Sequence, residues 1–244
     1  MKFYHSKLLN SVSNVTHAFT TRYSGNLAFH VNDNPLYVQK NHITLAKQLS
    51  YNKETLVHMK QIHSKLVHIV NENDNFKNPP TCDALITNKK NIPLMVMVAD
   101  CSPILFYDDE KKVIAVAHAG RAGAFKNIVK NVVDCCINEF QSLPKNIKVS
   151  IGASIRVCCY EVGSEIYEEA KDLNLEYAIH KKNKSYFLDI NKILNSQLLA
   201  CGIKDENIEI SKDCTSCNKD TYFSYRAKNI TGRFSGLIML HNSG

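Results

Sequence analysis

Two near-continuous apolar runs lie in the middle of the chain, at residues 93–99 and 113–117. Runs without alternating polar positions are typical of strands that are buried on both faces of a sheet. Shorter apolar runs predict strands elsewhere in the sequence. These further strands are expected at residues 15–21, 55–59, 65–70, 104–107 and 148–153, near Ile208 and near Leu237.

Between these strands the apolar residues follow a helical period. In residues 122–140 apolar side chains recur three or four positions apart, which predicts an amphipathic helix. Residues 71–80 are rich in Asn and end in two prolines, so we expect a surface loop there. The mixture of elements predicts an α/β fold with a mixed sheet. Further helices are expected at residues 35–49, 164–172 and 189–201.

Length and composition indicate a single enzyme-sized domain over residues 1–244. A chain of this length can bury a sizeable core, and no linker, repeat or low-complexity tract marks a boundary. No apolar stretch approaches the roughly 20 residues that span a bilayer. Residues 1–10 also lack the apolar segment of a secretory signal. We therefore expect a cytoplasmic protein with no membrane partner.

The formal net charge of +7 raises nucleic acid as a possible partner. The lysines are dispersed, however, and the densest group, at residues 181–184, reads as a solvated turn. A lysine-rich composition explains this charge better than a binding groove does, so we expect no nucleic-acid partner.

Nine cysteines, an odd number in a chain without an export signal, indicate reduced thiols. Cys214 and Cys217 form an isolated CxxC, which without a second pair is weak evidence for a metal site, and packing is the favoured interpretation. The neighbours Cys135 and Cys136 lie in the helical pattern and are expected to pack in the core. The sequence leaves open whether Cys158 and Cys159 do more than pack.

Three short segments follow strand-like runs and carry the most reactive side chains: residues 61–64 with His63, residues 99–103 with Cys101, and residues 117–120 with His118. Two imidazoles and a thiolate form a donor set that Zn²⁺ accepts with its fourth position left to water or substrate. Alternatively, each residue is an ordinary core or surface side chain. Taken singly, each is better explained by that second interpretation.

Together with other motifs, these segments resemble the YfiH family, also known as the laccase domain-containing family, along nearly the whole chain. The matching pieces are Thr20-Thr21-Arg22 with Gly25, residues 61–64, 82–87 and 99–103, His118-Ala119-Gly120, residues 158–163, 188–189 and 197–198, Cys214-Thr215, residues 223–226, and Gly232-Arg233.

The resemblance implies a fold, a site and an activity. It implies one α/β domain of four layers, an α-β-β-α sandwich with mixed sheets, CNF1/YfiH-like. His63, Cys101 and His118 match the family's zinc-binding catalytic centre. The implied enzyme phosphorolyses the purine nucleosides adenosine, inosine and 5'-methylthioadenosine with phosphate and also deaminates adenosine. Members have also been labelled copper-dependent polyphenol oxidases.

The chain departs from the family pattern beside the site. Where Trp-Arg-Gly is usual after His-Ala-Gly, this chain has Arg121-Ala122-Gly123 and no Trp at all. Arg121 restores a positive charge, but from a backbone position one residue earlier. Ala153-Ser154 stands where a Pro is usual, and His42 stands where Arg is common. These departures concern substrate fit more than the metal site.

Several other residues are candidates for substrate contact. Arg22, Arg226 and Arg233 are candidate clamps for phosphate or substrate, because guanidinium binds such oxygens bidentately. Each is equally consistent with an ordinary surface ion pair. Zinc deaminases use a Glu beside the metal, and no His-x-Glu motif exists here. The open acid/base candidates are Asp83, Asp100 and Glu161, and Asp83 and Arg121 are also expected at the substrate.

Three other functions remain open. Ten histidines without His-x-His or His-Cys-His disfavour a multicopper oxidase, although copper can bind a His/His/Cys set. Cys101 could instead be a nucleophile activated by His118 in a hydrolase or editing enzyme for peptidoglycan precursors. A non-enzymatic, metal-dependent binding module is the third possibility. The sequence does not reveal the oligomeric state.

Overall fold

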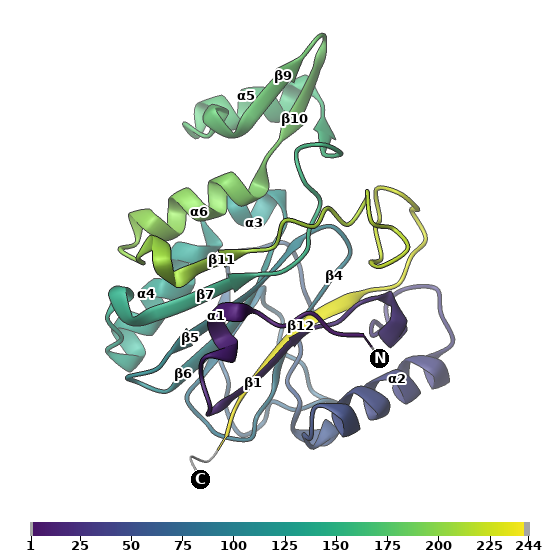
Figure 1. Ribbon diagram of the computed structural model, residues 1–244, viewed down its shortest axis with the longest axis vertical. Coiled ribbons are helices and arrows are strands. Elements are labelled where there is room, and N and C mark those ends of the chain that lie inside the picture. The colour runs from purple at the N-terminus through teal and green to yellow at the C-terminus, as the bar shows by residue number, and fades with distance from the viewer. Residues whose placement is uncertain (1, 242–244) are drawn as a thin grey trace.

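The computed structural model describes residues 2–241. Two β-sheets pack face to face at the centre of the molecule (Figure 1). The smaller sheet is antiparallel, with the order β1-β12-β4. The larger sheet has the order β11-β7-β5-β6-β3-β2, in which the two edge pairs β11–β7 and β3–β2 are parallel and the rest antiparallel. The strands are β1 (Val15–Phe19), β2 (Val67–Ile69), β3 (Ala84–Thr87), β4 (Leu94–Val98), β5 (Ser102–Asp108), β6 (Val113–Ala119), β7 (Ile147–Ile151), β11 (Ile208–Ile210) and β12 (Phe234–Leu240).

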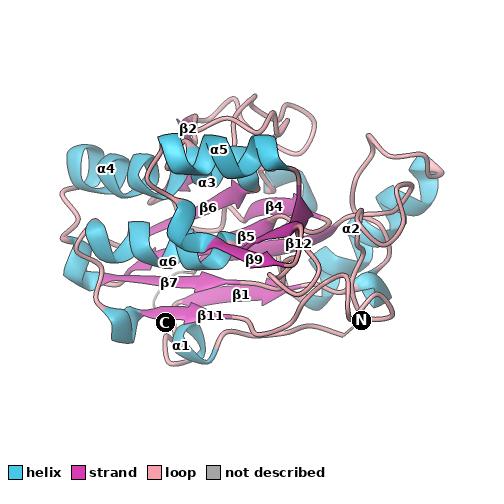
Figure 2. Cartoon of the chain, turned by 90° about the horizontal axis from the view of Figure 1, so that it is seen from above, coloured by secondary structure: helices cyan, strands magenta, loops and turns pink. Residues whose placement is uncertain are grey.

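Helices cover the outer faces of both sheets, as Figure 2 shows. Helices α3 (Arg121–Phe125), α4 (Ile128–Phe140) and α6 (Ile190–Ala200) pack on the larger sheet. Helix α2 (Pro35–Gln48) packs on the smaller sheet. The resulting layers confirm the α-β-β-α sandwich with mixed sheets. The shorter helices are α1 (Lys7–Asn10) and the 3-10 turns Arg22–Ser24, Lys53–Thr55, Pro144–Asn146, Glu176–Ala178 and Asp205–Asn207.

The central strands explain the apolar runs. The run at residues 93–99 forms β4, in which Leu94 and Val96 face the larger sheet while Met95 and Met97 face helix α2. The run at residues 113–117 lies in β6, and because both faces are covered, every position of β4 and β6 is buried. The two runs were therefore correctly interpreted as strands buried on both sides.

A third, small sheet projects from this body together with helix α5 (Ser164–Asp172) (Figure 1). It has the order β8-β10-β9, with β8 (Glu161–Val162), β9 (Ile179–Lys182) and β10 (Ser185–Leu188). The helix was predicted with the observed bounds, but the sheet was not predicted. Its strands are short and partly exposed, so they carry little apolar signal.

The structure corrects two other expected elements. Residues 55–59 form no strand, because Val57 makes only an isolated bridge to Leu94. The helix expected at 122–140 is divided into α3 and α4 at Asn127, which has a left-handed backbone (φ 58°) and caps α4 by accepting from the amide of Lys130. Strand β3 was missed as an element. Among residues 2–241, no helix combines the length and apolar character that crossing a membrane requires.

His42 on helix α2 is buried under the smaller sheet. Its Nε2 donates a hydrogen bond to the carbonyl oxygen of Leu27 (2.7 Å), while its Nδ1 is buried without a partner. The ring stacks on Phe29 and contacts the edge of Phe76. Burial lowers the pKa of His42 to about 4, and the hydrogen bond to Leu27 offsets only part of this effect. A proton on Nδ1 would be an unpaired buried charge.

We expect this histidine to make the fold sensitive to acid. Because the pKa of His42 is lowered in the folded state, the unfolded chain takes up the proton first as the pH falls. The free energy of unfolding is therefore unaffected by His42 above pH 6.5 and decreases as the pH falls from 6.5 toward 4. The cost at pH 4 is about 2 to 3 kcal/mol. In urea titrations His42→Gln should flatten this dependence, whereas His180→Gln, at an exposed position of β9, should not. Equal pH profiles for the wild type and His42→Gln would contradict the assignment.

Candidate active site

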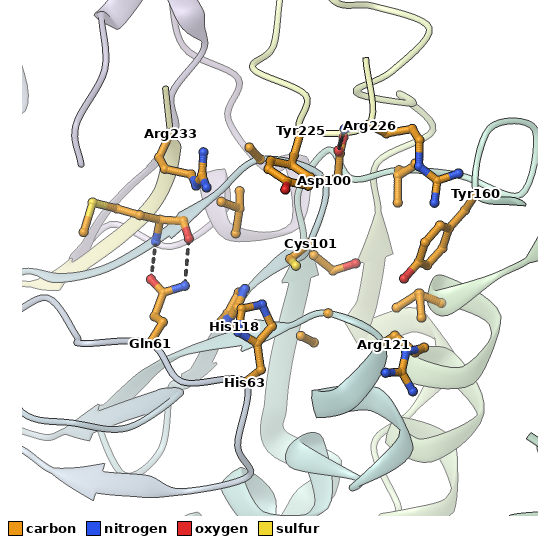
Figure 3. A pocket seen from close by; sticks show the side chains of 18 of the residues that line it. Gln61, His63, Asp100, Cys101, His118, Arg121, Tyr160, Tyr225, Arg226 and Arg233 are labelled. Carbon is orange, nitrogen blue, oxygen red and sulfur yellow. Dashed lines mark hydrogen bonds between the residues drawn. The ribbon is translucent and has the colours of Figure 1, made fainter. Parts of the chain in front are cut away.

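Neighbouring strands bring the three reactive side chains together. Cys101 directly precedes β5, and His118 lies near the end of β6, opposite Pro103. His63 comes from a turn with a left-handed backbone (φ 57°). One ligand atom of each residue lies within 4.8 Å of those of the other two. The structure thus brings together the three residues that the sequence singled out as metal ligands (Figure 3).

Gly120 makes room for the thiol of Cys101. A Cβ atom at this position would lie 2.7 Å from Sγ of Cys101 and 3.6 Å from Cδ2 of His63. A side chain there would therefore displace the sulfur. Gly120 is required for close approach of the backbone rather than for an unusual backbone angle, since its φ is −83°.

The carboxylate of Asp83 fixes both histidines from behind. It accepts hydrogen bonds from the amides of His63 (3.0 Å) and Ser64 (2.7 Å), from the Ser64 hydroxyl (2.7 Å), and from the amide of Ile62. It also accepts from Nδ1 of His118 (2.9 Å). Because a carboxylate only accepts, Nδ1 carries a proton, and Nε2 is the nitrogen left to bind a metal.

The charges in this cluster favour a thiolate. Burial alone would raise the pKa of Cys101, but the positive charge of His118 and hydrogen bonds from His118 and His63 lower it to about 6. Burial would lower the pKa of His118, but the Cys101 thiolate and Asp83 raise it to about 9. Asp83 itself is buried, yet its hydrogen bonds from His118 and Ser64 hold its pKa well below the usual range. A thiolate is the form of cysteine that binds metal ions.

The cluster opens into a cavity of about 470 Å³. Arg121, Arg226 and Arg233 line this cavity, as the sequence analysis expected of substrate-binding residues. Arg22 and Asp83 do not line it. Arg22 donates to the carbonyl of Lys219 and lies over the ring of Phe223. Asp83 is completely buried, so its geometry fits positioning of the histidines rather than contact with substrate.

The three arginines at the cavity differ in how they are held. Arg226 donates to the carbonyls of Cys159 and Glu161. Arg121 pairs with Glu169 on α5. Arg233 donates to the carbonyls of Thr231 and Gly232, and among the described residues it has no ion pair. Arg226 has no ion pair among the described residues either, but it donates to the backbone through both Nη1 and Nη2, whereas Arg233 donates through Nη1 alone. Arg233 is therefore the least engaged of the three.

The other two acid/base candidates differ in their place relative to the cavity. The two carboxylate oxygens of Asp100 accept from the Thr215 hydroxyl (2.6 Å) and the Arg226 amide (2.7 Å). Asp100 has a left-handed backbone (φ 92°), and it lines the cavity beside Cys101. Glu161 does not line the cavity.

Among the polar or aromatic residues that line the cavity, sequence reasoning did not single out His30, Gln61, Ser102, Tyr160 and Tyr225. Gln61 uses its amide to bind both the backbone oxygen (2.8 Å) and the backbone nitrogen (3.0 Å) of Met97, as the dashed lines in Figure 3 mark. Gln61, Tyr160 and Tyr225 all lie in segments that carried the family resemblance. No pattern in the sequence pointed to His30.

Comparison with known families gives one family model, described as multi-copper polyphenol oxidoreductase laccase, which matches residues 12–241. A purine nucleoside phosphorylase of Corynebacterium glutamicum is 33% identical over 237 residues, covering 93% of this chain and 94% of that protein. An adenosine deaminase named RL5, from an unknown prokaryotic organism, is 32% identical over 229 residues, covering 88% of this chain and 87% of that protein.

Comparison with solved structures gives a close match to the hypothetical protein YfiH of Bacillus licheniformis. The TM-score is 0.89 at 30% sequence identity, with 95% of this chain and 94% of that chain covered. The resemblance inferred from the sequence motifs is therefore confirmed.

The position of Asp83 predicts how the metal affinity of this cluster can be weakened. Asp83→Asn should weaken zinc binding about 10- to 100-fold, because the partner that orients His118 is changed. Competition with a chromophoric chelator measures the zinc affinity. Zinc bound at this cluster is identified as the zinc that Cys101→Ala no longer binds.

Asp74→Asn provides a matched control. Asp74 also accepts from a histidine, His68 (2.6 Å), but neither residue lines the cavity. Zinc binding should be unchanged in this variant. An equal effect of the two substitutions would show that Asp83 does not act through His118.

Proposed function

The chain belongs to the family described as multi-copper polyphenol oxidoreductase laccase, and within that family we propose that it is a zinc-dependent purine nucleoside phosphorylase with adenosine deaminase side activity. Its substrates are adenosine, inosine and 5'-methylthioadenosine, with phosphate as the second substrate. The observation that carries the proposal is the His63, Cys101 and His118 cluster at the floor of a cavity lined by cationic side chains. The names of the relatives support the same reaction class.

The donor set fits zinc. Two imidazoles and one thiolate are available, and Asp83 stands behind His118 in the way that carboxylates orient zinc-binding histidines. When bound, zinc supplies a Lewis acid that polarises an oxygen of phosphate or water. Copper also binds such donors, but of the two candidate metal clusters in residues 2–241 only one contains histidine. That arrangement does not favour a multicopper oxidase.

The cavity residues divide the remaining work. A volume of about 470 Å³ lies within the range of small-molecule sites, roughly 300 to 1,000 Å³. Arg233 binds the phosphate, because among the described residues its guanidinium has no ion pair and donates to the backbone through Nη1 alone. Tyr160 and Tyr225 provide aromatic surface for the purine base.

Phosphorolysis and deamination differ in the bond that breaks. In phosphorolysis an oxygen of phosphate bonds to C1' of the ribose and the C1'–N9 bond breaks. Adenosine then gives adenine and ribose 1-phosphate, with the electron pair and a proton going to the purine. In deamination water attacks C6 and ammonia leaves, giving inosine. In phosphorolysis negative charge develops on the departing purine and positive charge on the ribose, while in deamination negative charge develops on N1 of the ring. Cationic side chains hold the phosphate oxygens, and hydrogen-bond donors at the cavity can stabilise the charge on the purine.

One observation favours a second function. The pKa of Cys101 is lowered to about 6, and burial is outweighed by the charge of His118, as in cysteine–histidine pairs that perform acyl transfer. In this alternative Cys101 is a nucleophile in a hydrolase or editing enzyme for peptidoglycan precursors, and the protein uses no metal. A binding module without turnover is a further possible outcome, in which zinc raises the melting temperature without forming product.

Metal content and product formation measured together test the proposal. The wild-type protein should contain zinc at the cluster and should release adenine from adenosine only when phosphate is present. The products are separated and measured by chromatography. Some inosine should form with or without phosphate. Cys101→Ala should lose both the zinc and the products, because it removes a ligand.

The alternatives give different results. Cys101→Ala that retains this zinc but loses activity would make Cys101 a nucleophile. Metal-free wild-type protein that forms no purine product would overturn the phosphorylase and move the assignment to acyl transfer.

Arg233 offers a separate test of phosphate binding. Arg233→Gln should raise the KM for phosphate about tenfold or more, since a hydrogen-bonded charge is lost. The KM for adenosine should change less. Arg22→Gln is the matched control, because Arg22 does not line the cavity. Equal effects of Arg233→Gln on both KM values would contradict a phosphate-specific role.

A further inference from the structure

Four cysteines from two loops meet at a second place in the molecule. Cys158 and Cys159 lie between β7 and β8, and Cys214 and Cys217 follow β11. The four sulfur atoms all lie within 4.8 Å of one another. Cys217 Sγ is 3.3 Å from that of Cys159 and 3.6 Å from that of Cys158. The CxxC that is isolated in the sequence has its second pair in space.

These distances suit a single metal ion. Sulfur atoms joined in a disulfide are about 2.05 Å apart. Four thiolates bound tetrahedrally to zinc at about 2.3 Å lie about 3.8 Å apart, which follows from the tetrahedral angle. The observed separations, from 3.3 Å up to at most 4.8 Å, lie around this value. Small adjustments of the sulfur positions, with the closest pairs moving slightly apart, would complete the tetrahedron.

Backbone hydrogen bonds hold the two loops next to each other before any ion binds. The amide of Cys159 donates to the carbonyl of Arg156 (2.9 Å), which closes one turn. Asn218 closes the other turn by donating its amide (3.0 Å) and its side chain (2.9 Å) to the carbonyl of Cys214. The amide of Thr215 donates to the carbonyl of Ser154 (3.1 Å), which joins the loops.

The surroundings provide access and charge. Cys214 is buried, whereas Cys158 and Cys217 are exposed, so an ion can enter from solvent. Four thiolates and Zn²⁺ carry a net charge of −2, and the guanidinium of Arg226 lies nearby, donating to the carbonyl of Cys159 (3.2 Å). Cys135 and Cys136 are also adjacent in sequence, but they lie on α4 outside any group of potential metal ligands among residues 2–241.

We propose that Cys158, Cys159, Cys214 and Cys217 bind a second zinc ion with a structural role. Four protein ligands fill the tetrahedral coordination of zinc, so no position remains for water or substrate. This site is separate from the His63, Cys101 and His118 cluster and does not depend on the proposed reaction.

The site stabilises one wall of the active-site cavity. Tyr160, which lines the cavity, directly follows Cys159. Thr215 directly follows Cys214 and donates its hydroxyl to Asp100, the neighbour of Cys101. Arg226, whose guanidinium is bound to the carbonyl of Cys159, also lines the cavity (Figure 3). Zinc at the four cysteines would therefore tie together segments that are far apart in the sequence.

Zinc content per chain, measured by inductively coupled plasma mass spectrometry, tests this proposal. Wild-type protein should lose one equivalent of zinc on Cys217→Ser, which changes an exposed ligand. Cys135→Ser, at a cysteine outside the cluster, should lose none. The melting temperature of Cys217→Ser should fall by about 5 to 10 °C.

Cys101→Ala separates this proposal from the proposed function. If both proposals hold, the wild type contains two zinc ions, Cys101→Ala retains one and the double variant none. If only the four-cysteine site exists, Cys101→Ala matches the wild type, and Cys217→Ser still loses its zinc. Cobalt substitution adds a spectroscopic readout, because strong thiolate-to-cobalt absorption should persist in Cys101→Ala and weaken in Cys217→Ser.

Three results would overturn the proposal. The first is equal zinc content in the wild type and Cys217→Ser. The second is iron in place of zinc in the wild type. The third is peptide mapping of the wild type, alkylated without reduction, that finds these four cysteines joined as disulfides. The last two measurements use the wild type, so they test the proposal even if Cys217→Ser does not fold.

Discussion

One buried carboxylate organises the candidate active site. Asp83 accepts hydrogen bonds from three backbone amides and one hydroxyl of residues 62–64, and from the ring nitrogen Nδ1 of His118. Burial of a carboxylate is costly unless its oxygens are fully hydrogen-bonded. The same bonds that stabilise Asp83 fix the turn of His63 and the ring of His118. The geometry of both histidines therefore depends on a single side chain that lies behind them.

The two-sheet core provides the rigidity for this arrangement. β5 and β6 are buried along their whole length, so the register that places Cys101 beside Gly120 and near His118 is strongly specified. A slip of one residue would exchange the two faces of these strands, so that side chains that now face the helices would face the smaller sheet and the reverse. Packing that fixes the core thus also fixes the distance between the thiol and the imidazoles.

The sequence was most informative where the apolar pattern was strongest. The runs before Cys101 and around His118 predicted buried strands, and the family resemblance predicted the four layers that the structure has. Asp83 was identified as a candidate, but its position behind the histidines depends on contacts between distant segments. The same reason explains the four cysteines: Cys159 and Cys217 are 58 positions apart, and only folding places their sulfurs 3.3 Å apart. The left-handed Asn127 divided a helix whose apolar period was unbroken.

The ion pair between Arg121 and Glu169 joins the cavity to helix α5 of the projecting unit. This unit packs beside the central sheets rather than between them (Figure 1). Substitutions on α5 can therefore reposition an arginine of the cavity without disturbing the layers that carry the metal ligands. Over evolutionary time, a family could alter its choice of substrate through this outlying unit while its core sequence stays nearly constant.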